Sequence, residues 1–254
     1  MTFNVRYGTA DDGPDAWPLR REQVLDAIRE VAPAILGVQE ALDFQLAWLE
    51  QGLPSFRRLG QGREGGTRGE HAALFVERER FEVLESGDFW LSERPDEVAS
   101  VGWDAALTRI CTWARLRERA SGRELTVWNA HFDHRGAQAR VHSAQMLAER
   151  VEALHGARLV LGDFNAGERS APLATLLACG LRDSFRALHP DAREVGTFHA
   201  FRGGLAGEKI DHVLATHELE PVEAAIHSAP GANGRWPSDH HPVSAKFAWK
   251  PRAP

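Results

Sequence analysis

Runs of apolar residues, each bounded by turn residues, recur along the whole chain. Near its end, Val243, Ala245 and Phe247 alternate with Ser244 and Lys246, which is the period-two pattern of a half-buried strand. Other runs are almost continuously apolar, as expected for strands that are buried on both faces. Together these runs predict strands at residues 2–6, 34–39, 71–77, 80–91, 109–117, 124–131, 157–164, 210–215, 221–227 and 242–249.

Four segments show the spacing of an amphipathic helix instead. In the longest of them, Ala144, Leu147, Val151 and Leu154 recur every three or four positions, so that they lie on one helical face. Strands outnumber helices, and long helices separate groups of strands, so we expect two packed sheets with helices outside. The predicted helices are residues 18–32, 41–51, 136–155 and 171–180.

Composition supports a single domain with a complete core. The 254 residues are 43% hydrophobic and 26% charged, which is typical of a globular protein. The loop-like stretches are short enough to belong to one domain, so we expect residues 1–254 to form a single domain, and a monomer. These stretches are residues 8–16, 60–70, 92–104, 163–171 and 229–239.

Net charge and cysteine content limit the binding partners and the cellular compartment that we expect for this protein. The net charge of −6 gives no general attraction to polyanions, so nucleic-acid binding is not favoured, although a bound divalent cation would still attract a phosphate. Cys111 and Cys179 form no C-x-x-C pair, which fits a reducing compartment. With no apolar run of membrane-spanning length and no secretory signal, we expect a cytoplasmic protein.

Short polar side chains stand at the ends of several predicted strands, where a rigid apolar element can hold them in place. Each one alone has an ordinary structural explanation, such as a turn, a helix cap or a surface ion pair. The last of these sites is a turn between Pro237 and Pro242, directly before the final strand. The polar residues are Asn4, Glu40, His131, Asp163, Asn165, Asp211, Asp239 and His240.

Six motifs carry these residues: TFNVRYG (2–8), LGVQEA (36–41), TVWNAHFDHRG (126–136), LVLGDFNA (159–166), KIDHVLAT (209–216) and PSDHHPV (237–243). In type and order they resemble the endonuclease/exonuclease/phosphatase superfamily, which includes deoxyribonuclease-like enzymes, neutral sphingomyelinases and deadenylases. The resemblance implies an α/β (α+β) fold, a four-layer sandwich of two mostly antiparallel sheets packed face to face between outer helices. It places the active site at one end of the sheets.

The resemblance also implies roles for the polar set. Glu40 is similar to the family's metal-binding glutamate, Asp239 to a second carboxylate on the metal side, and Asn4 to an asparagine that supports the metal site. Asp163 and Asn165 match the pair that orients the attacking water and holds a phosphate oxygen.

The histidines complete the set that the resemblance implies. His131 matches a histidine that contacts the phosphate, and His240 resembles the catalytic histidine, with Asp211 as the carboxylate that orients it. Such a carboxylate fixes the tautomer and favours the imidazolium. Whether His240 or Asp163 takes the proton of the water is left open.

The chemistry of the set agrees with these roles. Carboxylate and amide oxygens suit Mg²⁺ or Mn²⁺ better than Zn²⁺, and a hard cation offsets the negative charge of a phosphate ester. The segment at 69–93 is similar to a subgroup of small bacterial family members and, more distantly, to the deadenylases. Further candidates for substrate contact are Arg109, Glu70, His71, His134, Trp236 and Phe198.

The sequence alone is compatible with several functions. The leading one is a Mg²⁺-dependent phosphoesterase that acts on a small phosphomonoester or phosphodiester. A nuclease acting on DNA or RNA, including a deadenylase-like 3′ exonuclease, is the first alternative, and no basic, aromatic-rich insertion favours it. A zinc hydrolase that uses His131, His134 and His240 is a second alternative. A non-catalytic binding module that retains the fold is the third.

Overall fold

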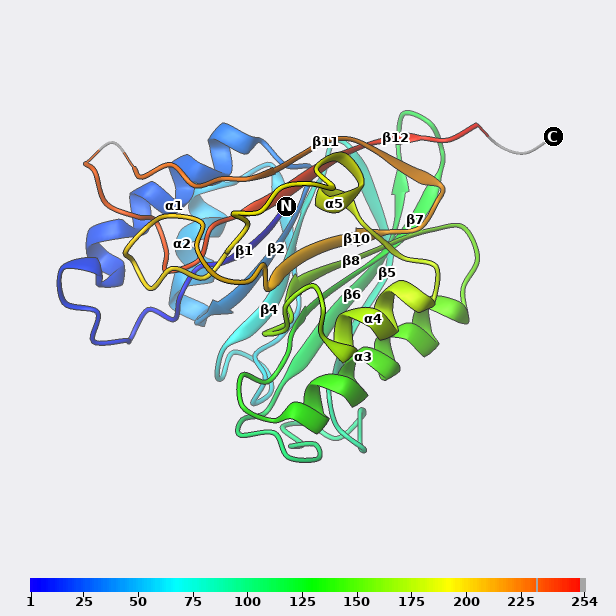
Figure 1. Ribbon diagram of the computed structural model, residues 1–254, viewed down its shortest axis with the longest axis horizontal. Coiled ribbons are helices and arrows are strands. Elements are labelled where there is room, and N and C mark those ends of the chain that lie inside the picture. Colours follow the sequence, from blue (N-terminus) through cyan, green and yellow to red (C-terminus); the bar gives the residue numbers. More distant parts are fainter. Residues whose placement is uncertain (232, 252–254) are drawn as a thin grey trace.

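Two sheets of six strands each form the centre of the computed structural model, which describes residues 1–231 and 233–251 (Figure 1). The first sheet has the order β11-β12-β1-β2-β4-β3 and the second β5-β6-β7-β8-β10-β9. The strands of the first are β1 (Thr2–Asn4), β2 (Ile35–Ala41), β3 (Phe56–Leu59), β4 (His71–Glu77), β11 (Leu219–Ile226) and β12 (Val243–Trp249). Those of the second are β5 (Phe81–Trp90), β6 (Ile110–Glu118), β7 (Glu124–His131), β8 (Ala157–Asp163), β9 (Arg182–Asp183) and β10 (Asp211–Ala215).

Each sheet has one parallel pair of neighbouring strands near its middle, and its other pairs are antiparallel. β1 is parallel to β2, and β7 is parallel to β8. A parallel pair needs a long crossover, which α1 (Trp17–Val31) supplies in the first sheet and α3 (Ala137–Glu152) in the second. The carboxyl ends of a parallel pair lie at the same edge of a sheet, so Asn4 is aligned with Gln39, and His131 with Asp163.

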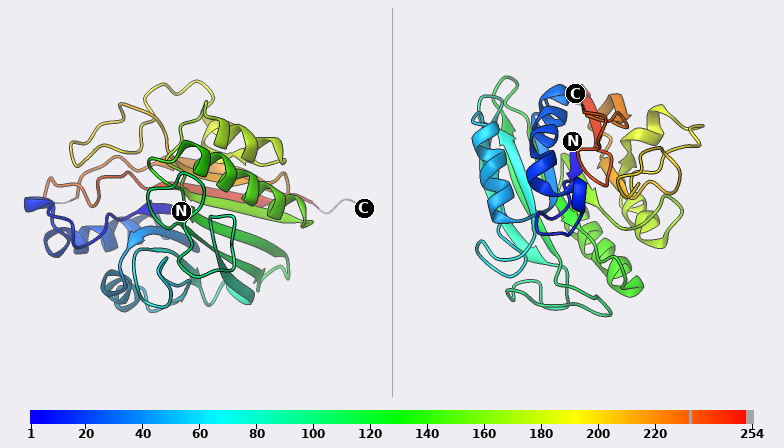
Figure 2. Two further views of the ribbon diagram at one scale, coloured as in Figure 1. Left: turned by 90° about the horizontal axis from the view of Figure 1, so that it is seen from below. Right: turned by 90° about the vertical axis from the view of Figure 1, so that its left-hand side faces the viewer.

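Helices cover the outer face of each sheet (Figure 2). α1 and α2 (Asp43–Gly52) bury one apolar stripe each against β1, β2 and β4, with Leu25, Ile28 and Leu46 in that layer. α3 and α4 (Ala171–Ala178) cover the second sheet, and Leu147 and Leu173 lie in the apolar layer between these helices and the sheet. The four-layer sandwich with mostly antiparallel sheets is therefore confirmed.

The space between the sheets is mainly apolar, but a polar bridge crosses its interior at Asn129. The side chain of Asn129 on β7 reaches across to the first sheet, where its Nδ2 donates to the carbonyl oxygens of Val38 (3.1 Å) and Ala73 (2.8 Å). Its Oδ1 accepts from Nε2 of Gln39 at 2.6 Å. Asn129 is fully buried, so it is an inter-sheet bridge and not an amide at a sheet edge.

Replacing Asn129 by leucine will lower the free energy of unfolding by about 2–4 kcal/mol, because each buried polar group that loses its partner costs about 1–3 kcal/mol. Urea denaturation measures the change. The matched control is Asn233→Ala at an exposed loop position, for which we expect a change within about 0.5 kcal/mol. An Asn129→Leu protein as stable as the wild type would contradict the role of the bridge.

Some elements differ from the sequence prediction. The first strand ends at Asn4 and not at residue 6, because Arg6 has a left-handed backbone (φ 56°) and its N–H donates to Oδ1 of Asn4. The second helix starts at Asp43, since Ala41 still belongs to β2. Four short elements were not predicted, because two to five residues carry little periodicity: β3, β9, the 3₁₀ helix η1 (Gly13–Asp15) and α5 (Ser184–Leu188).

Candidate active site

A cavity of about 620 Å³ opens at the edge where both parallel strand pairs end. Of the predicted site residues, ten line it, so residues far apart in the sequence converge there: Glu40, Glu70, Arg109, His131, His134, Asp163, Asn165, Phe198, Asp239 and His240. A larger cavity of about 710 Å³ has mainly apolar walls that include Leu125, Val213 and Phe247. It contains none of the predicted residues, so we assign the site to the smaller cavity by its chemistry.

Asn4 joins the two sheets at the base of this cavity. It is fully buried, and its Nδ2 donates both to Oε1 of Glu40 (3.0 Å) and to Oδ2 of Asp163 (2.9 Å). Its Oδ1 accepts from the backbone N–H of Arg6. Asn4 therefore sets the spacing of two carboxylates that belong to different sheets.

Glu40 is aimed into the cavity by an irregularity of β2. The pairing with β4 shifts its register between Val38 and Ala41, and Glu40 has a left-handed backbone (φ 64°). Such a bulge redirects a side chain, and strain of this kind is common in functional sites. Its Oε2 accepts from the N–H of Tyr7 (3.1 Å), so the carboxylate is held in place and does not cap the following helix.

Asp239 stands with Glu40 on the cavity wall. Burial raises the pKa of Asp239, and the negative charge of Glu40 adds to this effect. The nearest cation is Arg6, whose Nε is 3.8 Å from Oδ2 of Asp239. Two oxygen donors of like charge in one small cavity fit a hard divalent cation, which would relieve their repulsion.

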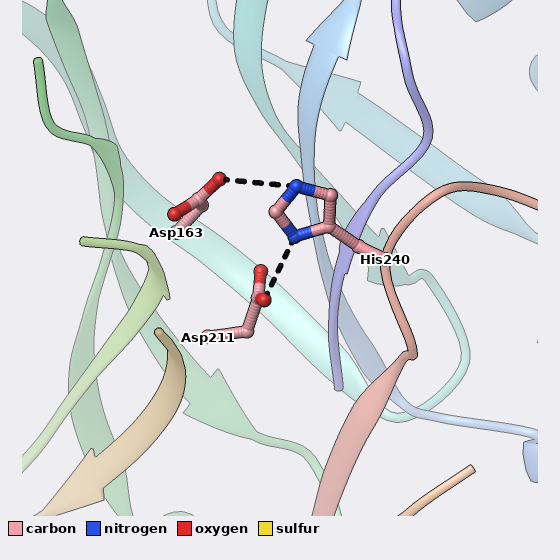
Figure 3. A group of neighbouring side chains, drawn as sticks. All are labelled: Asp163, Asp211 and His240. Atoms are coloured by element: carbon pink, nitrogen blue, oxygen red, sulfur yellow. Dashed lines mark hydrogen bonds and ion pairs between the residues drawn. The ribbon is translucent and has the colours of Figure 1, made fainter. Parts of the chain in front are cut away.

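His240 lies between two aspartates (Figure 3). Its Nδ1 is 2.9 Å from Oδ2 of Asp211, and its Nε2 is 3.8 Å from Oδ2 of Asp163. Ligand atoms of these three residues lie within 4.8 Å of one another. Because Nδ1 of His240 is already engaged by Asp211, this group is suited to acid–base chemistry, and Glu40 and Asp239 are residues that could hold a cation.

The charges of this group are coupled. Burial alone would lower the pKa of His240, but the negative charges of Asp211 and Asp163 raise it well above its ordinary value. Burial, together with the charge of Asp211, raises the pKa of Asp163 to about 7. Asp163 can therefore exchange a proton with a neighbouring water near neutral pH, while the surrounding negative charges favour the protonated form of His240.

His131 and Asn165 form the adjoining wall. Nδ2 of Asn165 lies 3.2 Å from Nε2 of His131 and donates to the carbonyl of Phe132 (3.0 Å). Burial, followed by the positive charges of Arg109 and Arg63, lowers the pKa of His131 well below its ordinary value. His131 is therefore neutral at pH 7, and its Nε2 can accept from Asn165.

The turn that carries Asp239 and His240 is held from several sides. Oγ of Ser238 donates to the carbonyl of Asn4 (2.7 Å), and Nη1 of Arg20 donates to the carbonyl of Pro237 (2.9 Å). Arg20 was not predicted, because an arginine on an amphipathic helix normally faces solvent, yet only 1% of its surface is exposed. It binds the turn that positions the catalytic candidates.

A second buried cluster that the sequence did not reveal supports the strand of Asp211. Nζ of Lys209 donates to Oδ2 of Asp183 and to Nδ1 of His212, both at 2.6 Å. Nε2 of His212 lies 3.1 Å from the carbonyl of Ala166. Lys209 is fully buried, so it does not pair with Asp211 on the surface.

Four predicted residues do not line the cavity. Asn4 and Asp211 lie behind it and act through the residues that they contact. His71 points away, and its Nδ1 lies 3.1 Å from the carbonyl of Ala41. Trp236 packs against the rings of His199 and His241, so it supports the turn and not a substrate contact.

We expect the buried ring of His199 to make the protein less stable in acid. Its Nδ1 accepts from the N–H of Gly203 (3.1 Å); burial, followed by the positive charges of His241 and His240, lowers the pKa of His199 to about 3. The unfolded chain has a histidine pKa of about 6.5, so it binds more protons than the folded chain between these values. The free energy of unfolding therefore falls as the pH decreases from 6.5 toward 3.

Urea denaturation across this pH range measures that loss, with His199→Asn as the comparison because asparagine offers an acceptor that does not titrate. The pH dependence should be shallower for His199→Asn than for the wild type. Parallel curves for the two proteins would show that His199 is not responsible.

Comparisons with known proteins agree with this fold. The profile of the Endonuclease/Exonuclease/phosphatase family matches residues 1–240. A mannosyl-6-phosphatase from Bacteroides thetaiotaomicron has a similar structure (31% identity, TM-score 0.90, 98% of each chain covered). So does an endonuclease/exonuclease/phosphatase protein from Bacteroides vulgatus (33% identity, TM-score 0.87, 98% and 97% covered).

More distant structures share the fold alone. The catalytic domain of human Nocturnin is 17% identical to this chain in sequence, and its structure matches with a TM-score of 0.77. The match covers 98% of this chain and 92% of the Nocturnin chain. No curated protein sequence gives a significant match. Within residues 1–231 and 233–251, no helix has both the length and the apolar character needed to cross a membrane.

Proposed function

Because the chain belongs to the endonuclease/exonuclease/phosphatase family, we propose that it hydrolyses phosphate esters with the help of Mg²⁺ or Mn²⁺. One observation carries the proposal. Asn4 bonds Glu40 and Asp163 in the cavity that His240 also lines, so a carboxylate for a cation and an acid–base group face the same space. A bound cation would offset the charge of the ester and act as a Lewis acid.

The residues of the chain have distinct tasks in this mechanism. Glu40 and Asp239 would hold the cation, and Asn4 keeps Glu40 in position. Asp163, whose pKa is raised to about 7, and His240, whose pKa is raised well above its ordinary value, would orient the attacking water and move its proton.

The remaining wall binds the phosphate. The amide of Asn165 and the ring of His131 lie next to Asp163, with Nε2 of His131 3.6 Å from its Oδ2. Asp211 holds the ring of His240 through Nδ1, so that Nε2 faces the reacting centre.

We propose a small ester as the substrate. The cavity of about 620 Å³ has the size of a small-molecule site, and the net charge of −6 disfavours a polyanion. A similar chain is named a mannosyl-6-phosphatase, so phosphorylated sugars are suitable first substrates.

A panel of phosphate esters tests the proposal. Purified protein is assayed with sugar phosphates, p-nitrophenyl phosphate, bis(p-nitrophenyl) phosphate, an oligonucleotide and plasmid DNA, in Mg²⁺, Mn²⁺, Zn²⁺ or EDTA. We expect hydrolysis of a small ester in Mg²⁺ or Mn²⁺ and loss of that activity in EDTA and in Asp163→Ala.

The other outcomes separate the alternatives. Salt-sensitive degradation of nucleic acid in preference to small esters would identify a nuclease. Activity restored by Zn²⁺ but not Mg²⁺ would identify a zinc hydrolase. Hydrolysis of no ester above the level of Asp163→Ala would point to a binding module.

A further inference from the structure

A buried arginine stands on the cavity wall away from the carboxylates of Glu40 and Asp239. Arg109 directly precedes β6, lines the cavity, and has only 5% of its surface exposed. Its Nη2 donates to Nδ1 of His134 at 3.1 Å. Long cationic side chains are almost never buried this deeply without a partner, so the guanidinium needs an anion.

The carboxylates of the described residues satisfy it only in part. Among residues 1–231 and 233–251, Nε and Nη1 of Arg109 make no hydrogen bond. The nearest carboxylate is Asp133, with Oδ2 3.5 Å from Nε. Asp133 is occupied elsewhere, because its Oδ1 accepts from the N–H of Gly136 and its Oδ2 from that of Leu107. A buried donor without an acceptor is destabilising, and a ligand oxygen would supply the missing acceptor.

A neighbouring ion pair is already complete. Arg63 and Glu70, which also line the cavity, are joined by a contact of 2.8 Å between Nη1 and Oε2. Among the described arginines that line the cavity, Arg109 is therefore the one with buried donors that lack an acceptor. The positive charge of Arg109 also acts on the wall of the cavity that is proposed to bind phosphate, because it contributes to the lowered pKa of His131.

We propose that Arg109 is a specificity residue that selects phosphomonoesters over phosphodiesters, by donating to the additional oxygen that only a monoester presents. This inference rests on the proposed function. A monoester has three non-bridging oxygens and a charge near −2, whereas a diester has two and a charge of −1. The third oxygen of the monoester occupies the position of the second alkoxy group of the diester, where a buried cation favours an oxygen anion over an uncharged substituent.

The reaction itself is ordinary hydrolysis. Water forms the new bond to phosphorus, the bond from phosphorus to the ester oxygen breaks, and the alcohol leaves with one proton of the water. The other proton remains on the inorganic phosphate. Arg109 takes part only by binding.

Arg109→Met tests the inference with two substrates that share a leaving group, p-nitrophenyl phosphate and bis(p-nitrophenyl) phosphate, in Mg²⁺. Loss of a charge-assisted hydrogen bond should lower kcat/KM for the monoester by about 10–100-fold, while the diester value should change by less than about 3-fold. Inhibition by inorganic phosphate should weaken in parallel. Arg94→Met, at a position where 63% of the side chain is exposed, is the matched control.

An equal fall for both substrates, or an unchanged ratio, overturns the inference. If Arg109→Met does not fold, Arg109→Lys provides the same comparison, because lysine keeps the charge but loses the planar fork. If the wild type hydrolyses no ester of the panel above the level of Asp163→Ala, the proposed function fails. Calorimetric titration with inorganic phosphate in Mg²⁺ then decides: about 10-fold weaker binding by Arg109→Met supports the anion site, and equal binding refutes it.

Discussion

Replacing His240 by glutamine should lower kcat for phosphate-ester hydrolysis by about 10²–10⁴-fold, which is the usual contribution of one acid–base group. Glutamine preserves much of the volume but cannot exchange a proton near pH 7. His240 sits 2.9 Å from Asp211 and 3.8 Å from Asp163, so its removal also leaves two buried carboxylates without their shared cation. The loss should appear in kcat more than in KM, because the group acts on the reacting water.

The measurement is steady-state kinetics on the best ester of the panel, with thermal unfolding to verify folding. His217→Gln is the matched control, since 75% of the His217 side chain is exposed, and it should retain wild-type kcat. Activity of His240→Gln within about 3-fold of the wild type would remove His240 from the mechanism.

Replacing Glu40 by glutamine should abolish most of the dependence on Mg²⁺. Loss of a metal-binding carboxylate removes several kcal/mol of transition-state stabilisation, and about 4 kcal/mol corresponds to ~10³-fold in kcat/KM. The same substitution affects binding in the absence of any substrate. A ligand that binds only the folded state raises stability by about 2.7 kcal/mol at one hundred times its Kd, so Mg²⁺ should raise the Tm of the wild type and raise that of Glu40→Gln much less.

Each protein is compared with itself in EDTA and in Mg²⁺, so that any direct effect of the substitution on stability cancels. Glu223→Gln, with 69% of the side chain exposed, should show the wild-type shift in Tm. An equal Mg²⁺-induced shift in Glu40→Gln and the wild type would place the cation elsewhere.

Periodicity predicted most of the fold, because long strands and helices bury one face each and leave a regular pattern in the sequence. The same reasoning placed His131 and Asp163 at strand ends, and the parallel register of β7 and β8 brings them side by side. Glu40 was predicted as a site residue, but its bulge was not. A single extra residue in a strand changes the direction of a side chain without changing the composition.

The features that the sequence did not predict depend on contacts between distant elements. Glu70 and His71 were both candidates, yet neighbours at the start of a strand point in opposite directions, and only Glu70 lines the cavity. The direction depends on register, which is set by pairing partners elsewhere in the chain. The burial of Arg20 and Lys209 could not be predicted for a similar reason, because burial of a cation depends on acceptors that other segments supply.

The position of Asn4 and Ser238 at opposite ends of the chain has a consequence for biosynthesis. Ser238 donates to the carbonyl of Asn4, and the side chain of Asn4 bonds Asp163, so the site closes only once residues that are 234 positions apart have both been synthesised. A nascent chain, or a product of premature termination before His240, lacks the acid–base residue and one anchor of its amino-terminal strand. We therefore expect fragments that end before His240 to show none of the proposed activity.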